Sequence, residues 1–119
     1  MLKRLVVEIG TGVDQHGQDP TRAAVKGVRD AMSRVCLVGL KEVFGLEDLD
    51  LMRVEIVVAT PDPGRVRPEE VAGAVPFGEK TVRVVKGGMT AKGIKVPELG
   101  DDSEDILVAN AALTVMVEV

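Results

Sequence analysis

Residues Leu5 to Asp19 read LVVEIGTGVDQHGQD, a stretch in which an apolar segment runs into a glycine-rich loop. Apolar side chains occupy every second position from Leu5 to Ile9, which predicts a half-buried strand. The loop after it contains the only histidine of the chain, His16, with Asp14 two positions earlier. This loop is therefore the first place to look for a reactive site.

A helix is predicted directly after the loop. Asp19 suits the capping position and Pro20 the first helical position. Apolar side chains then recur at three- and four-residue spacing on one face: Ala24, Val25, Val28, Met32 and Val35. Gly39 predicts the end of this helix, and a short second turn is expected over residues 40–44.

The rest of the chain alternates between predicted strands and one further helix. We expect strands over Met52–Ala59 and Thr81–Lys86, and a short helix over Glu69–Ala74 between them. The segment Gly87–Asp105 is rich in glycine and charge, which predicts a mobile loop or lid. Clean alternation in LTVMVEV, residues 113–119, predicts the last strand.

The predicted order is β-α-β-α-β-β in one domain over residues 1–119. Two helices would cover one face of a four-stranded mixed sheet, which is an α+β two-layer sandwich. The other face would still present apolar side chains at Val6, Val57, Val85 and Met116. Such a face is best explained by burial against another subunit, so we expect a homo-oligomer.

Composition limits the classes of partner. The net charge of −4 and the presence of only two Phe, with no Trp or Tyr, argue against nucleic-acid binding. A single cysteine, Cys36, excludes an intramolecular disulfide and is expected to fill the core. The apolar run at the N-terminus is too short for a signal peptide or a membrane span, so we expect a cytoplasmic protein. The scarcity of Asn and Gln is typical of thermophilic proteins.

Asp14 and His16 are two positions apart, which in an extended segment places both side chains on one side. A carboxylate and an imidazole there would suit a divalent metal such as zinc, manganese or iron. The same pair would also serve as a catalytic acid/base pair without a metal. The structural alternative is that Asp14 accepts loop hydrogen bonds and His16 packs against the start of the helix.

Glycines in the loop raise the question of ligand binding. A dinucleotide-binding fingerprint is excluded because Gln15 occupies its third glycine position. A simple anion cradle remains, and its candidate residues are Gly10, Thr11, Gly12 and Gly17.

A second candidate ligand loop carries Lys86, Lys92 and Lys95 among glycines 87, 88 and 93. It would close on a small anionic ligand or form a solvated surface.

Two polar features lie near the C-terminus. The acidic run at residues 101–105 suits a solvated surface better than a calcium loop, because it lacks the Gly and Glu spacing of such loops. Asn110 is the only Asn and lies in the apolar run ILVANAALTV, so its amide requires partners. It would pin a bulge or turn, or contribute to a ligand site beside the first strand.

The segment from Gly10 to Gly17, GTGVDQHG, resembles the GxGxDxHG signature of a family of conserved hypothetical proteins. That family is mainly bacterial with plant relatives, and its function is uncharacterised. Chain length and the ending VANAALTV are also similar, so the resemblance covers the whole chain.

The shorter motif GTGVDQH is similar to the GxGxDxH of methylerythritol cyclodiphosphate synthase. That resemblance implies a chorismate-mutase-like architecture, a trimer with sites between subunits, and a divalent metal bound by Asp14 and His16. The chain departs from that enzyme because it has no second histidine and is shorter.

Two hypotheses follow. In the first, an oligomeric α+β protein has a small-ligand site at Asp14 and His16, with or without a metal, and the lysine loop holds an anionic substrate. In the second, the protein is a non-catalytic oligomeric binding or structural module, and the motif only stabilises the loop.

Overall fold

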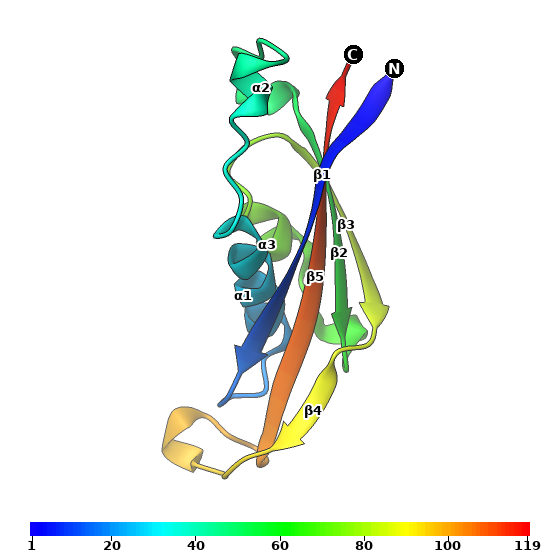
Figure 1. Cartoon of the computed structure of the whole chain (residues 1–119). Coiled ribbons are helices and arrows are strands. Elements are labelled where there is room, and N and C mark those ends of the chain that lie inside the picture. Colours follow the sequence, from blue (N-terminus) through cyan, green and yellow to red (C-terminus); the bar gives the residue numbers. More distant parts are fainter.

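The computed structural model describes residues 1–119 as a mixed five-stranded sheet with three α-helices (Figure 1). The strands are β1 (Leu2–Asp14), β2 (Arg53–Thr60), β3 (Glu79–Lys86), β4 (Met89–Lys92) and β5 (Asp105–Glu118). The α-helices are α1 (Pro20–Met32), α2 (Gly39–Glu42) and α3 (Pro68–Gly73). Three short 3₁₀ helices, η1 (Leu49–Leu51), η2 (Pro63–Arg65) and η3 (Pro97–Leu99), lie in the connections. No helix is long and apolar enough to cross a membrane.

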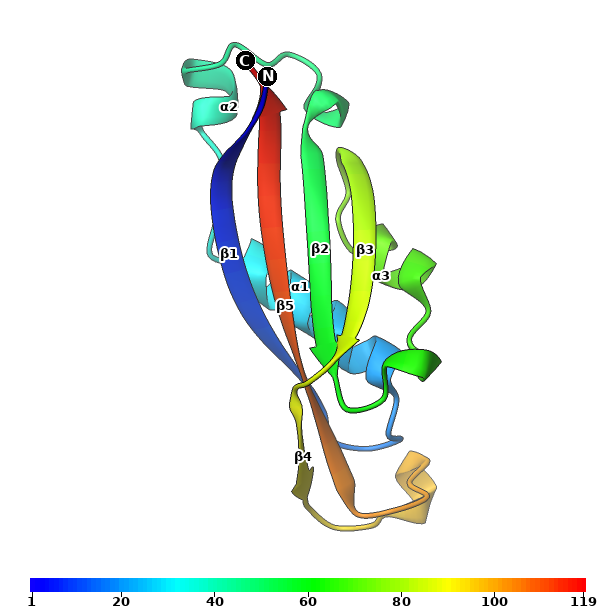
Figure 2. The same ribbon diagram turned by 90° about the vertical axis from the view of Figure 1, so that its right-hand side faces the viewer.

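Strand β5 is the centre of the sheet, and the order is β1-β5-β2-β3. It runs antiparallel to both β1 and β2, whereas β2 and β3 are parallel. The parallel pair fits the expected helical crossover, since α3 lies between these two strands in the chain. Strand β4 pairs with the first residues of β5 and extends the sheet beyond the ends of β2 and β3 (Figure 2).

The helices α1 and α3 lie on one face of the sheet, and the opposite face is uncovered (Figures 1 and 2). Valine, leucine and alanine make up most of the core between the layers, with Val28, Val54, Ile56, Val58 and Val71 almost fully buried. The two-layer α+β architecture predicted from the sequence is therefore present.

Two glycines of β1 allow α1 to lie directly on the sheet. A Cβ added at Gly12 would lie 1.9 Å from the Ala23 carbonyl oxygen, and one at Gly10 would lie 2.2 Å from that of Gly27. No larger residue fits either position without moving the helix. The glycine spacing therefore serves helix–strand packing, and β1 continues through both glycines to Asp14.

This packing reverses the predicted orientation of the first strand. Because Gly10, Gly12 and Asp14 face α1, the alternate residues face outward, and Val7 and Ile9 are 49% and 60% exposed. Val6 faces the helices, so its predicted outward position was wrong. A register shift between Arg4 and Val6 precedes this part of the strand.

Several element boundaries also differ from the prediction. Five strands and three α-helices replace the expected four and two. Helix α1 ends at Met32, before the apolar pattern ends at Val35. The predicted loop Gly87–Asp105 contains β4 and η3, and the last strand has 14 residues rather than seven. The last strand, β5, is longer than predicted because it pairs with β1 along the whole length of β1.

Candidate functional site

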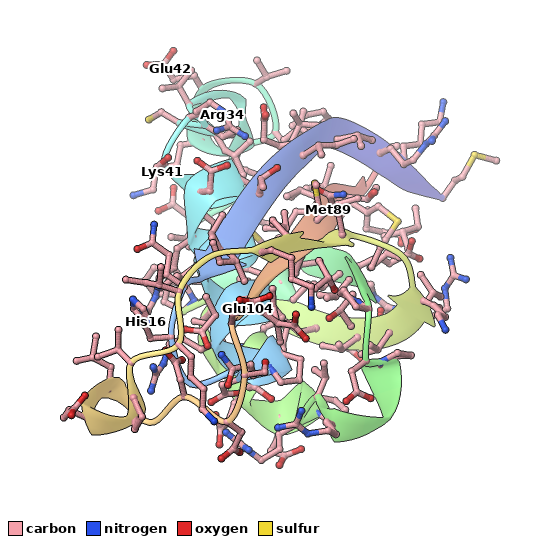
Figure 3. The ribbon with its side chains drawn as sticks, turned by 90° about the horizontal axis from the view of Figure 1, so that it is seen from below. His16, Arg34, Lys41, Glu42, Met89 and Glu104 are labelled. Atoms are coloured by element: carbon pink, nitrogen blue, oxygen red, sulfur yellow. The ribbon has the colours of Figure 1, made fainter.

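The GxGxDxHG loop packs against the loop that precedes β5, at the end of the molecule that is viewed in Figure 3. Asp101 is the centre of this contact, and only 5% of the residue is exposed. Its Oδ2 atom lies 2.6 Å from Nδ1 of His16, and its Oδ1 atom accepts a hydrogen bond from the Gly17 amide at 2.7 Å. The carboxylate thus joins two segments that are more than 80 residues apart in sequence.

Two further donors complete the hydrogen bonds to the Asp101 carboxylate. The amide of Val96 donates to Oδ2 at 2.8 Å, and Nε2 of Gln18 donates to Oδ1 at 2.9 Å. The Val96 amide, His16, Gly17 and Gln18 hold the pKa of the Asp101 carboxyl far below its usual range, although burial opposes this effect. Asp101 is therefore a fully hydrogen-bonded, ionised carboxylate.

Gln18 binds the same loop with its side-chain amide. Its Nε2 atom also donates to the Asp105 carbonyl at 3.0 Å, and its Oε1 atom accepts from the Asp102 amide at 3.0 Å. Its backbone φ is 50°, in the left-handed region that non-glycine residues seldom adopt. The preceding Gly17 has φ of 98°, so the motif ends in a sharp turn that directs both residues at the 101–105 loop.

Asp14 has a separate role in the same loop. It is 2% exposed, accepts a hydrogen bond from the Asp19 amide at 2.8 Å, and pairs with Arg22 at 3.6 Å. Asp19 in turn caps α1 through the amides of Thr21 and Arg22, as the sequence predicted. Asp14 therefore fixes the start of α1, whereas the residue that orients His16 is Asp101.

The structure divides the sequence-predicted site residues among four places. Asp14, His16 and Gly17 lie in the motif loop. Gly10 and Gly12 lie under α1, whereas Thr11 and Asn110 meet on the outer face, where Oγ1 of Thr11 donates to Oδ1 of Asn110 at 3.1 Å. The two lysines lie on β3 and β4: Lys86 is exposed, and Lys92 pairs with Asp105 at 2.5 Å.

These placements bear on the two ligands expected from the sequence, a small anion and a divalent metal. Strand β5 separates β4 from β1, so Lys92 is on the opposite side of β5 from Asp14. The amide of Thr11, one of the expected anion donors, binds Oδ2 of Asp30 instead at 2.8 Å. No three His, Cys, Asp or Glu side chains are grouped as a metal cluster. Cys36, expected in the core, is exposed.

Sequence reasoning missed Asp101 and Gln18. Asp101 is one of four acidic residues within the segment 101–105, and nothing local distinguishes it from its neighbours. Its partners lie at the other end of the chain, so only the fold reveals them.

The match to known families covers residues 4–115, almost the whole chain, and the family is described as conserved hypothetical protein (Lin0512_fam). The chain belongs to this family. This confirms the resemblance drawn from the GxGxDxHG motif. No curated protein matches the chain.

A solved structure is also similar to this member of the Lin0512 family. It is the crystal structure of an FtsZ-like protein of unknown function from Nostoc punctiforme. The two chains are 47% identical with a TM-score of 0.89, and the match covers 99% of this chain and 98% of the other.

Proposed function

We propose that this protein is a non-catalytic homo-oligomeric module that associates through the outer face of its sheet. In this proposal the GxGxDxHG loop stabilises the fold. The observation that carries it is the exposure of large apolar side chains on β1: Ile9 is 60% exposed, Val7 49% and Val13 36%. Soluble monomers seldom expose a continuous apolar surface of this kind.

Strand register joins these side chains to apolar positions on the neighbouring strands, with the polar pair Thr11 and Asn110 among them. Ile9 lies opposite Ala112 of β5, which lies opposite Val57 of β2. Neighbouring positions on the same face include Ala59, Val85 and Val108. The apolar area thus extends across all four long strands.

Charged side chains surround this apolar area on the sides of β2 and β3. Arg53 and Glu79 pair at 3.6 Å, and Glu55 and Arg83 lie on the same outer face. Both signs of charge are present, so two copies of this face would not meet with charges of one sign only. An apolar centre with a mixed polar rim is typical of protein interfaces.

The face is a better contact surface than the edge of β1. Side chains of α1 and of the residues just after it already occupy backbone groups along that edge: Lys26 donates to the Val13 carbonyl, Arg34 to the Ile9 carbonyl, and Asp30 accepts from the Thr11 amide. Charged side chains that cover an edge strand prevent the addition of another strand. Association is thus directed to the face.

Native mass spectrometry and light scattering at micromolar concentration test this proposal. We expect wild type to be a defined oligomer, with the mass giving the number of chains, and Ile9→Glu to be a folded monomer. Val43→Glu is the matched control, because Val43 is 75% exposed and lies at the end of α2, away from the outer face. A monomeric wild type, or an Ile9→Glu oligomer of unchanged mass, would contradict the proposal.

His16 supports a second candidate function, a small-ligand or divalent-metal site at the motif. Since Asp101 only accepts hydrogen bonds, Nδ1 of His16 donates to it and Nε2 is available as an acceptor or ligand. The His16 side chain is 28% exposed, so part of the imidazole ring reaches solvent. A carboxylate that orients a histidine in this way is a common feature of metal and acid/base sites.

Metal analysis of the untagged protein separates the two functions. Stoichiometric metal in wild type that is lost in folded His16→Ala and Asp14→Ala variants would support the second candidate. Metal-free wild type protein, together with a large loss of stability in both variants, would support the structural role of the motif.

A further inference from the structure

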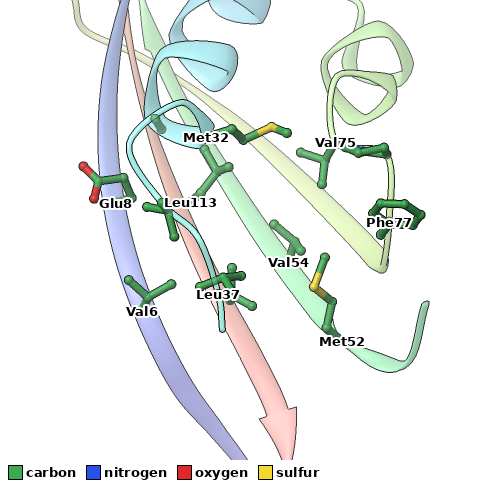
Figure 4. Close-up of a pocket in the computed structure, with 13 residues that line it drawn as sticks. Val6, Glu8, Met32, Leu37, Met52, Val54, Val75, Phe77 and Leu113 are labelled. Carbon is green, nitrogen blue, oxygen red and sulfur yellow. The ribbon is translucent and has the colours of Figure 1, made fainter. Parts of the chain in front are cut away.

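A cavity of about 150 Å³ lies between the sheet and the segments that follow α1 and α3 (Figure 4). Eleven of its thirteen lining residues are hydrophobic, including Val6, Met32, Leu37, Met52, Phe77 and Leu113. None of the lining residues belongs to the GxGxDxHG loop, so the cavity is a separate feature of the fold.

The cavity exists because α1 ends before the sheet does. In space, β1 and β5 extend beyond the end of α1 at Met32. The inner face of the sheet there is covered by connecting segments, through Leu37 and through Val75 to Phe77. Pro76 and Phe77 in the lining are exposed, so the space is an apolar pocket that opens to solvent.

Its size suits a specific kind of occupant. In another protein an apolar cavity of about 150 Å³ binds a molecule the size of benzene. Phe77 is 46% exposed, and Met32 and Met52 have flexible side chains that adapt to a ligand. The cavity thus has both the volume for one hydrocarbon ring and a lining that allows entry.

Charge at the rim distinguishes among such ligands. Glu8 is the only charged residue of the lining, and Figure 4 shows its carboxylate at the outer edge, on β1. The nearest cation, Arg34, lies 3.4 Å from Glu8 but also binds Asp30 at 2.8 Å and the Ile9 carbonyl. Because Arg34 divides its guanidinium between Glu8 and Asp30, Glu8 keeps part of its negative charge at the rim and favours a cationic ligand. Lys80 lies at the other side of the lining, where its Nζ atom donates to the Val75 carbonyl at 2.9 Å.

We propose that this cavity binds a small amine with a hydrocarbon body of about one ring. The ring occupies the space among Val6, Met52 and Leu113, and the ammonium group lies at the rim beside Glu8. This site is independent of self-association, because Val6 faces the helices whereas its neighbour Val7 faces outward.

The probes that test the site are phenethylamine and 3-phenylpropionate, which share a ring but have opposite charges. In methyl-labelled protein we expect phenethylamine to shift the signals of Val6, Met32, Met52 and Leu113 in a saturable way. Phenylpropionate should bind about tenfold more weakly, because attraction by the partly exposed Glu8 becomes repulsion. Glu8→Gln should remove most of that difference.

Adjacent residues provide a matched pair of variants. Val6→Phe fills the cavity and should abolish the shifts, whereas Val7→Phe adds the same ring on the outer face and should leave them unchanged. Leu37→Phe fills the cavity from a connecting segment, and it replaces Val6→Phe in the test if Val6→Phe does not fold.

Three results would overturn the proposal. These are equal or stronger binding of phenylpropionate, binding that survives in both cavity-filling variants, and the absence of cavity shifts in wild type.

Discussion

Nδ1 of His16 lies 2.6 Å from Oδ2 of Asp101, although the two residues are 85 positions apart in the chain. This contact joins the loop after the first strand to the loop before the last. Asp101 also binds the amides of Gly17 and Val96, so one carboxylate fixes three segments. The motif loop and the segment that follows β4 consequently form one hydrogen-bonded unit.

Asp101→Asn should lower the melting temperature by several degrees at pH 7. Its amide can no longer accept all four hydrogen bonds, and its NH₂ group would face donors such as the Val96 amide. Because the pKa of Asp101 is lowered in the folded state, its stabilisation is present above the ordinary aspartate pKa of about 4. The stabilisation is lost as the pH falls through the lowered pKa.

Thermal unfolding of both proteins between pH 7 and pH 2 measures this effect. The difference in melting temperature should shrink as the pH falls below about 4. Asp102→Asn is the control, because no hydrogen bond to the side-chain oxygens of Asp102 is present and only its amide binds Gln18. A difference between wild type and Asp101→Asn that does not shrink below about pH 4 would contradict the assigned role.

Gln18→Glu should destabilise the protein more than Gln18→Ala at pH 7. The substitution replaces the Nε2 donor with an oxygen, which would face Oδ1 of Asp101 and the carbonyl of Asp105. At about pH 4 the new carboxyl group gains a proton and becomes a donor again. We therefore expect the order of the two variants to reverse in thermal unfolding, and a constant order across pH would exclude this explanation.

The fold class was predictable from the sequence because local patterns dominate it. Asp19 and Pro20 mark the start of α1 through local capping chemistry, and alternation marks β2 and β3. The orientation of β1 was not predictable from alternation alone, since both of its faces carry apolar residues. The close approach of α1 to Gly10 and Gly12 decides the orientation, and that is a tertiary effect.

Only part of the candidate site was predictable from the sequence, because the rest of it also depends on tertiary contacts. The motif indicated Asp14 and His16, and both lie in one ordered loop. Their partners depend on chain segments that no local pattern connects: Asp101 reaches His16 because β5 returns beside β1 over its whole length. Strand pairing places Lys92 on the other side of β5 from the motif loop, whereas Asn110 lies beside the first strand, against Thr11.

Gly12→Ala should cost about 3 kcal/mol or more of unfolding free energy. The added Cβ would lie 1.9 Å from the Ala23 carbonyl oxygen and 2.4 Å from the Gly27 amide nitrogen, so α1 must move away from the sheet. Gly64→Ala is the control, because nothing lies within 4 Å of a Cβ at that position. Urea unfolding of the two variants measures the difference, and equal stabilities would refute the tight helix–strand contact.

Asn110→Val tests the position of the contact surface. Asn110 is exposed on the outer face, where its Oδ1 atom accepts a hydrogen bond from Thr11 and the surrounding positions are Ala112, Ala59 and Val108. A single polar residue in an apolar contact fixes the register of the partners and reduces their affinity. In the proposed oligomer, the valine should therefore strengthen association but produce several species where wild type gives one. Sedimentation velocity distinguishes these outcomes, and a single species with unchanged affinity would place Asn110 outside the interface.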